Sequence, residues 1–277
     1  MKNAFYHKPA TGSNGQTCSR SVALWQWPNV LAIDAALIAV FWQAALAAAM
    51  DLPLSMVAHL VLGLSVWLTY TADRLVDVAQ RDASTLLSAR HRFVKRQRVR
   101  LWRIGLAGLI VNLVAATQLT GTQLKQGGGL LLFCLLYTFL NQKLSRRFFP
   151  KELCVALIYA VGVVILLPES PPCGFLALFT CLCLLNCLMI GKKETRVDAH
   201  LHVHSMAGKL RESSLTPLIW LGATFTFFIA TPLRGALLAS FILLGLLHAL
   251  RARFPKEVFR VLADGVLLLG PLFALVL

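Results

Sequence analysis

Residues 53–72 read PLSMVAHLVLGLSVWLTYTA, and the residues 73–103 that follow read DRLVDVAQRDASTLLSARHRFVKRQRVRLWR. The first stretch is apolar over the roughly 20 residues that a helix needs to cross a bilayer. The second contains nine lysines and arginines, the residues that concentrate in the cytoplasmic loops of membrane proteins. Together the two stretches predict a membrane-spanning helix that ends in a basic cytoplasmic segment.

The whole chain has the composition of a membrane protein. Its 277 residues are 57% hydrophobic and only 14% charged, yet the formal net charge is +15. A chain this apolar places most of its length in lipid, so a soluble cytosolic enzyme is excluded. The seven cysteines are odd in number and mostly lie within apolar runs. This pattern argues against a disulfide framework and favours a role as small apolar side chains.

Nine apolar runs are candidates for membrane-spanning helices. They lie at about 29–50, 53–72, 101–119, 128–141, 152–168, 172–191, 215–230, 235–250 and 257–277. The predicted fold class is an all-α membrane protein, a bundle of about nine transmembrane helices. Residues 1–28 are expected to form a cytoplasmic N-terminal segment that is no secretory signal, and residues 29–277 a single transmembrane helical domain.

The basic residues predict the orientation of the bundle. With the N-terminus in the cytoplasm, alternate spans deliver 25 of the 27 lysines and arginines to the cytoplasmic side, and only Lys125 and Arg234 fall outside. Basic cytoplasmic loops then lie near 73–100 and 192–214. We expect a multi-pass protein of a bacterial cytoplasmic membrane, in contact with membrane lipids. Nucleic acid is not an expected partner, because no soluble domain is present to bind it.

Four of the 12 acidic residues form two pairs at that same face. Asp73 and Asp77 close the second span, Glu194 and Asp198 close the sixth, and the spacing of four residues puts each pair on one helix face. Mg²⁺ is usually held by one or two carboxylates together with substrate phosphates, so these acids are candidate metal ligands. The alternative is that each pair only neutralises basic residues on its own helix.

Residues 69–77, TYTADRLVD, resemble the first aspartate-rich motif of the UbiA superfamily of intramembrane prenyltransferases, N-D-x-x-D-x-x-x-D. Asp73 and Asp77 match the second and third aspartates of that motif. Thr69 and Tyr70 stand where the family has its asparagine and its first aspartate, which removes one expected carboxylate.

Two further stretches resemble the same family. The second acidic motif is similar to Asn186-(x)7-Glu194-(x)3-Asp198, with an amide where an acid is common. After the fourth span, family members have a tyrosine followed by basic residues and a proline. The matching residues in this chain are Tyr137, Lys143, Arg146, Arg147 and Pro150.

The resemblance implies a bundle around a central cavity that opens toward lipid, with both acidic motifs at its cytoplasmic mouth. It implies Mg²⁺ as cofactor, bound by the four acids, and a prenyl diphosphate and a lipophilic acceptor as partners. The expected diphosphate-binding residues are Arg90, Arg92, Lys143 and Arg147. The expected cavity-lining residues are Asp34, Tyr70, Tyr137 and Asn186. No residue is assigned a catalytic role.

Other polar residues lie within or near the spans. An acid inside a membrane helix costs roughly 2.5–3.5 kcal/mol on insertion scales, so Asp34 is expected to face a cavity or a partner. Asp264 lies four residues after Arg260, and an ion pair between them on one helix face is expected. The run of His200, His202 and His204 alternates with a period of two, which indicates a loop, with metal binding as the less favoured alternative.

These features predict a Mg²⁺-dependent prenyltransferase that transfers an isoprenyl group from its diphosphate to an apolar, aromatic acceptor. Two alternatives stay open. The first is a divergent bundle that binds a lipid or a partner without chemistry, favoured by Tyr70 and Asn186 in place of acids. The second is a secondary transporter, disfavoured because the acids lie at one membrane face and not at the midplane.

Overall fold

The computed structural model describes residues 22–79, 89–144, 150–200 and 206–276, and for residues 89, 141–144 and 196–200 it describes the backbone alone. These residues form α-helices joined by turns and short 3-10 helices, and they contain no strand. The α-helices are α1 (Trp27–Val30), α2 (Ile33–Ala49), α3 (Met56–Ala79), α4 (Ala89–Arg96), α5 (Arg98–Ala116), α6 (Gly121–Leu144), α7 (Lys151–Val164), α8 (Cys173–His200), α9 (Met206–Lys209), α10 (Leu215–Phe228), α11 (Arg234–Ala249) and α12 (Lys256–Val276).

The all-α prediction is confirmed, and each of the nine apolar runs corresponds to one long helix in the described part of the chain. Four of these helices are long and apolar enough to cross a membrane on their own: α3, α5, α8 and α12. A fifth span results if α1 and α2 are counted as one bent helix. The other helices are shorter or carry more polar residues. This is the pattern of a multi-pass membrane protein.

Three helices extend well past the predicted runs through polar residues, and one of them is α3, which continues from residue 72 to Ala79. The helix α6 begins at Gly121 rather than near residue 128, since Thr120 and Gln123 form reciprocal side-chain to backbone hydrogen bonds of 3.1 and 3.3 Å at its start. The helix α8 continues from residue 191 to His200 through a charged segment. Hydropathy predicts only the part of each helix that lies in lipid.

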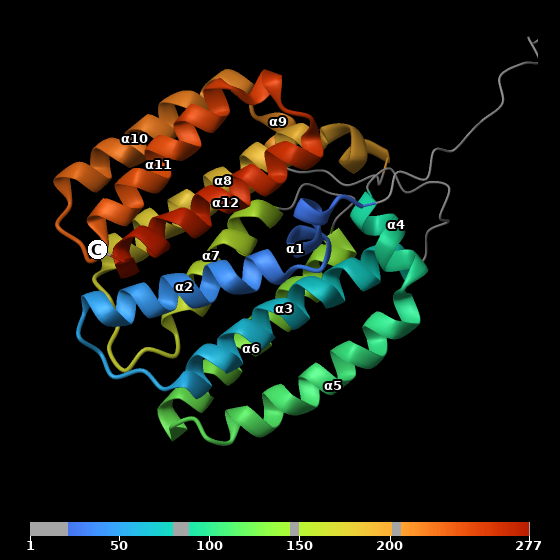
Figure 1. The fold of residues 1–277 in the computed structure, drawn as a ribbon, viewed down its shortest axis with the longest axis vertical. Helices are drawn as coiled ribbons and strands as arrows, with labels where there is room; N and C mark the ends of the chain where they lie inside the picture. Colours follow the sequence, from blue (N-terminus) through green and yellow to red (C-terminus); the bar gives the residue numbers. More distant parts are fainter. Residues whose placement is uncertain (1–21, 80–88, 145–149, 201–205, 277) are drawn as a thin grey trace, which may run out of the picture.

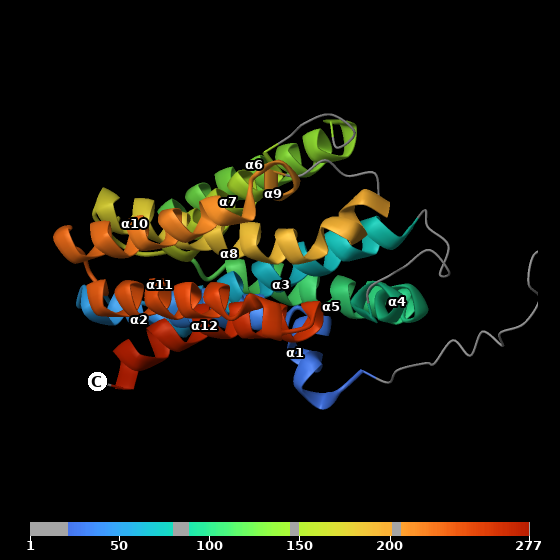
Figure 2. The same ribbon diagram turned by 90° about the horizontal axis from the view of Figure 1, so that it is seen from above.

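The helices pack as two layers (Figure 1). Figure 2 shows α2, α11 and α12 in one layer and α6, α7, α8 and α10 in the other, with α5 at one edge. The helices α2, α7, α8 and α12 contact one another in the centre, and α3 packs against α2 and α5. The large side chains of the core come from α2, α8 and α12 and also from α10 and α11.

Aromatic rings hold the two layers together. The ring centroids of Trp42 on α2 and Phe179 on α8 are 4.6 Å apart, and Phe175 stacks on Phe179 at 5.6 Å. All three side chains are fully buried. The indole nitrogen of Trp42 donates a 2.8 Å hydrogen bond to the carbonyl oxygen of Leu267 on α12, so its one polar atom is satisfied inside the core.

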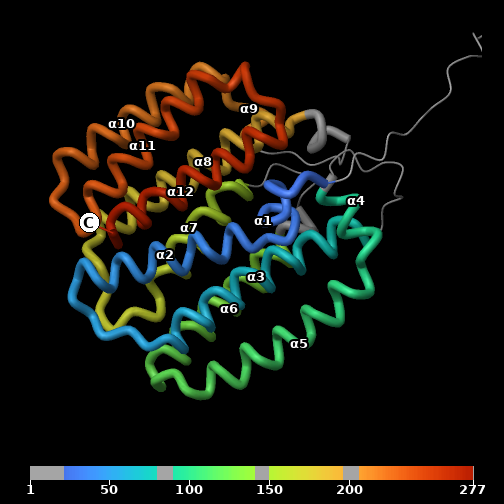
Figure 3. The backbone as a smooth tube through the Cα atoms, viewed as in Figure 1, coloured from blue at the N-terminus to red at the C-terminus, as the bar shows by residue number. Residues whose placement is uncertain are grey.

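The short helices α1, α4 and α9 lie at one end of the bundle, and the C-terminus lies at the other, as the backbone trace in Figure 3 also shows. The ends of the long helices that border the basic segments are gathered at the first end. The six described cysteines, Cys134, Cys154, Cys173, Cys181, Cys183 and Cys187, are free, as their apolar surroundings predict.

Candidate functional site

The site begins at a break in the first span, where the chain bends by 73° between α1 and α2. Ala32 at the break is fully buried and has a φ of 58°, in the left-handed region. A helix that ends leaves its last carbonyl oxygens short of donors. Here Nη1 of Arg74 donates to the carbonyl oxygens of Asn29 and Val30, each over 2.8 Å. Arg74 therefore fastens α3 to the break, and it also lies within electrostatic range of Asp73 on its own helix.

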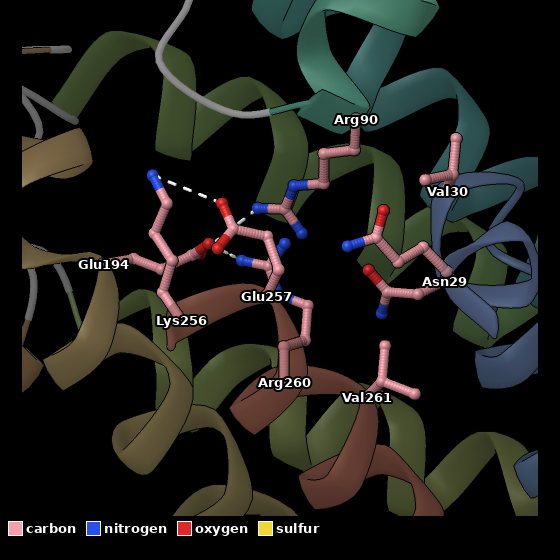
Figure 4. A pocket seen from close by; sticks show the side chains of 9 residues that line it. Asn29, Val30, Arg90, Glu194, Lys256, Glu257, Arg260 and Val261 are labelled. Atoms are coloured by element: carbon pink, nitrogen blue, oxygen red, sulfur yellow. Dashed lines mark hydrogen bonds and ion pairs between the residues drawn. The ribbon is translucent and has the colours of Figure 1, made fainter. Parts of the chain in front are cut away.

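Glu194 joins three elements beside this break. Nη2 of Arg90, on α4, donates to Oε2 of Glu194 over 3.3 Å, and Nη2 of Arg260, on α12, contacts Oε1. The Glu194 side chain is only 13% exposed and that of Arg260 only 9%. Figure 4 shows both guanidinium groups converging on the carboxylate. Both oxygens of Glu194 are thus engaged by arginines that are distant in sequence.

These residues border a cleft at the basic end of the bundle. It is lined by Gln26, Asn29, Val30, Arg90, Glu194, Lys256, Glu257, Arg260 and Val261. Three side chains bring positive charge and two bring negative charge, and Lys256 lies 3.6 Å from the neighbouring Glu257. The cleft has a volume of about 30 Å³, which is enough to hold ordered water. The cleft is therefore electropositive and narrow.

A chain of polar side chains continues from the cleft into the bundle. Nδ2 of Asn29 donates to Asp34 over 2.7 Å and to Asp264 over 2.9 Å. Asn186 on α8 donates to the second oxygen of Asp264 over 3.2 Å. The expectation that Asp34 faces a partner within the bundle is met by Asn29. The predicted Arg260–Asp264 ion pair is wrong, because Arg260 reaches Glu194 while Asp264 bonds to two amides.

The first acidic pair, Asp73 and Asp77, lies on α3. The Asp73 side chain is exposed, within electrostatic range of Arg90 and Lys151. Oδ2 of Asp77 lies 4.0 Å from Nε2 of His91, which is buried on α4. The two residues of this pair therefore face basic groups.

The described residues do not fit a Mg²⁺ site of the predicted composition. No three His, Cys, Asp or Glu side chains within the described ranges are grouped so that they could hold a metal ion. Glu194, one of the four predicted ligands, accepts from two arginines instead. The side chain of Asp198 lies outside the described residues.

Two of the four predicted cavity residues, Asp34 and Asn186, belong to the polar chain that reaches the cleft through Asn29. Tyr70 is half-buried within electrostatic range of Asp34 and Asp264, and Tyr137 is half-buried near Asp73. Tyr159 was not among the predicted cavity residues. Its hydroxyl donates a 2.7 Å hydrogen bond to the carbonyl oxygen of Ala35. That Tyr70 and Tyr137 line a substrate cavity stays a prediction.

Of the four predicted diphosphate-binding residues, Arg90 lines the cleft and Arg92 is exposed on α4. The Lys143 side chain and all of Arg147 lie outside the described residues, as do the side chain of His200 and all of His202 and His204.

Sequence reasoning missed Arg260, Lys256 and Asn29 as residues of the cleft. Their signal was present, since two cations and an amide stand at the ends of the last and first spans. Only the packing of α12 beside α8 and α1 shows that they meet.

The fold has a known counterpart. The chain is similar to the apo structure of a UbiA homolog from Aeropyrum pernix K1, with a TM-score of 0.59 over 88% of this chain and 98% of that one, at 12% sequence identity. No protein-family model matches the chain. No curated protein matches it either. The fold is therefore UbiA-like.

Proposed function

From the UbiA-like fold and the basic cleft, we propose that this protein is an intramembrane prenyltransferase that takes a prenyl diphosphate as donor. The observation that supports this most is the convergence of Arg90, Lys256 and Arg260 where the helices bearing the two acidic motifs end. Guanidinium groups match phosphate geometry and form strong charge-assisted hydrogen bonds. The proposed role of the cleft is to bind the diphosphate head group.

The chemistry that this site would perform is the departure of a diphosphate. Breaking an allylic carbon–oxygen bond builds negative charge on the leaving group, and fixed cations in a site poor in water stabilise that charge. Arg90 and Arg260 are held in place by the fold, so they need little reorganisation as the charge develops. The isoprenyl chain and a lipophilic aromatic acceptor would occupy the apolar bundle and the surrounding lipid.

Mg²⁺ and the orientation in the membrane remain predictions. The carboxylates left for a metal are Asp73, Asp77 and Asp198, and a bound metal would add its charge to that of the arginines. We propose that the basic end faces the cytoplasm across a bacterial cytoplasmic membrane, with residues 1–28 on that side and residues 29–277 as one membrane domain.

A second candidate function is favoured by one observation. Glu194 is engaged by two arginines and the described residues hold no three-ligand metal group. A bundle that binds a prenyl lipid or a partner without chemistry would have no need of such a group.

The test compares binding with turnover on the full chain in detergent. Farnesyl diphosphate, Mg²⁺ and a panel of phenolic and quinone-type acceptors are added, and products are detected by mass spectrometry. A prenylated acceptor with release of inorganic diphosphate supports the transferase. Binding without any product supports the second candidate, and absence of binding contradicts both.

A matched pair of variants locates the binding. Arg90→Gln is expected to weaken the binding of farnesyl diphosphate. Arg234→Gln changes an exposed arginine at the start of α11, at the opposite end of the bundle. This variant is expected to bind farnesyl diphosphate as tightly as the wild type.

A further inference from the structure

We infer that Glu194 is an internal anion that occupies the arginine clamp of Arg90 and Arg260, and that the phosphate head group binds by displacing it, without a divalent cation. This inference rests on the proposed function and concerns the same cleft. It gives Glu194 the opposite role from the metal ligand that the acidic motif predicts.

The first reason is the engagement of Glu194. Each of its two carboxylate oxygens contacts a different guanidinium, one from α4 and one from α12, and the side chain is 13% exposed. A divalent cation bound to the same oxygens would lie next to two buried positive charges, and like charges repel strongly where water is scarce. The geometry thus favours an anion at this position over a cation.

The second reason is competition for the same nitrogens. Glu194 already contacts Nη2 of Arg90 and Nη2 of Arg260. An anionic group that pairs with these two nitrogens has to replace the carboxylate, which then swings away. Because the anion replaces the carboxylate, the arginines keep a negative partner throughout, and the large penalty of leaving buried charges unpaired is avoided.

The third reason is an unused donor. Nε of Arg260 is buried, and it has no hydrogen-bond partner among the described residues. The other end of the same guanidinium contacts Glu194. A single carboxylate shared between two arginines leaves Nε of Arg260 without an acceptor. A diphosphate has more oxygens than a carboxylate and can accept a hydrogen bond from this nitrogen as well.

The fourth reason is charge. With Glu194 displaced, the lining of the cleft keeps three cationic side chains, Arg90, Arg260 and Lys256, and one acidic side chain, Glu257. A diphosphate carries several negative charges, so the freed clamp matches it better than a single carboxylate does. Arg90, Arg260 and Lys256 thus neutralise the charge of the diphosphate, the role that the sequence predicts for Mg²⁺.

The test measures the affinity of the full chain in detergent for farnesyl diphosphate, by titration calorimetry, in excess EDTA and in Mg²⁺. The wild type is expected to bind about equally in both conditions. Glu194→Gln removes the competing anion and is expected to bind about tenfold more tightly, because the ion pairs of Glu194 with Arg90 and Arg260 no longer have to be broken. Arg260→Gln is expected to bind at least about tenfold more weakly.

Glu212→Gln is the matched control. Glu212 pairs with Arg251 over 2.5 Å at the same end of the bundle, outside the cleft lining, so its loss should leave the affinity unchanged. A second measurement applies if Glu194→Gln folds poorly. Inorganic diphosphate should raise the midpoint of thermal unfolding of this variant more than that of the wild type.

The outcomes separate the inference from the proposed function. Binding that requires Mg²⁺ and is lost in Glu194→Gln would overturn the clamp and leave the transferase proposal standing. Absence of binding in every condition would overturn both. Binding in EDTA that strengthens in Glu194→Gln supports the clamp whether or not a product forms.

Discussion

Asn29 and Asp264 are joined by a hydrogen bond of 2.9 Å, although 235 residues separate them in the sequence. The same Asn29 nitrogen donates to Asp34, so one amide lies between two carboxylates contributed by the first and last spans. This contact closes the helical bundle beside the cleft.

Replacing Asn29 by Leu is therefore expected to destabilise the fold. Two carboxylates inside the bundle would lose a donor each, and a buried polar group that loses its partner costs about 1–3 kcal/mol. A lower midpoint of thermal unfolding in detergent is the measurement. Asn112→Leu serves as the control, since Asn112 makes one 3.0 Å bond to Ser65 and should cost only about 0.6 kcal/mol. An equal loss in both variants would contradict the bridging role.

Arg74 and Asp73 are adjacent in sequence and are predicted to differ in what they do. Arg74→Met leaves the carbonyl oxygen of Val30 without its donor and that of Asn29 with only the 3.3 Å bond from the backbone nitrogen of Ala32, so a loss of about 1–3 kcal/mol in stability is expected. Asp73→Asn alters an exposed side chain and should shift stability by no more than about 0.5 kcal/mol. Thermal unfolding of the two variants side by side measures the difference.

Asp73→Asn is instead expected to affect turnover. If the first motif assists departure of the diphosphate, prenyl transfer should fall at least about tenfold with the fold intact. Asp51→Asn is a matched control, because Asp51 is exposed in the turn after α2 and has a φ of 52° that asparagine tolerates. The rate of product formation is measured by mass spectrometry for both variants. An unchanged rate in Asp73→Asn would show that Asp73 takes no part in the reaction.

The contact between α10 and α11 predicts a steric effect. A Cβ atom placed on Gly222 would lie 2.4 Å from the ring of Phe241, which is fully buried. Gly222→Ala should therefore destabilise the bundle by about 1–3 kcal/mol. Gly105→Ala places its Cβ in open space on α5 and should stabilise slightly, by about 0.5–1 kcal/mol. Opposite shifts of the unfolding midpoint are the expected result.

The nine helices could be predicted from the sequence because each apolar run is a local property of the chain. The sequence predicts helix boundaries outside lipid less well. The start of α6, for example, depends on the hydrogen bonds between Thr120 and Gln123. Polar side chains and not hydropathy set such boundaries.

The site was predicted only in part, for a different physical reason. The sequence correctly places Glu194 on the same helix as the sixth apolar run, beyond its end, but its partners Arg90 and Arg260 come from elements far away in sequence. The spacing of four residues wrongly pairs Arg260 with Asp264. Inside a membrane bundle, a charged group contacts whichever partner the packing of helices brings nearest.

The break between α1 and α2 has a consequence for how the protein is made. The carbonyl oxygen of Val30 at the break depends on Arg74, which follows Val30 by 44 residues. During synthesis, the first span therefore leaves the ribosome before its donor exists. We expect the first helix to enter the membrane straight and to bend only when the second arrives, so that the cleft is assembled late in biogenesis.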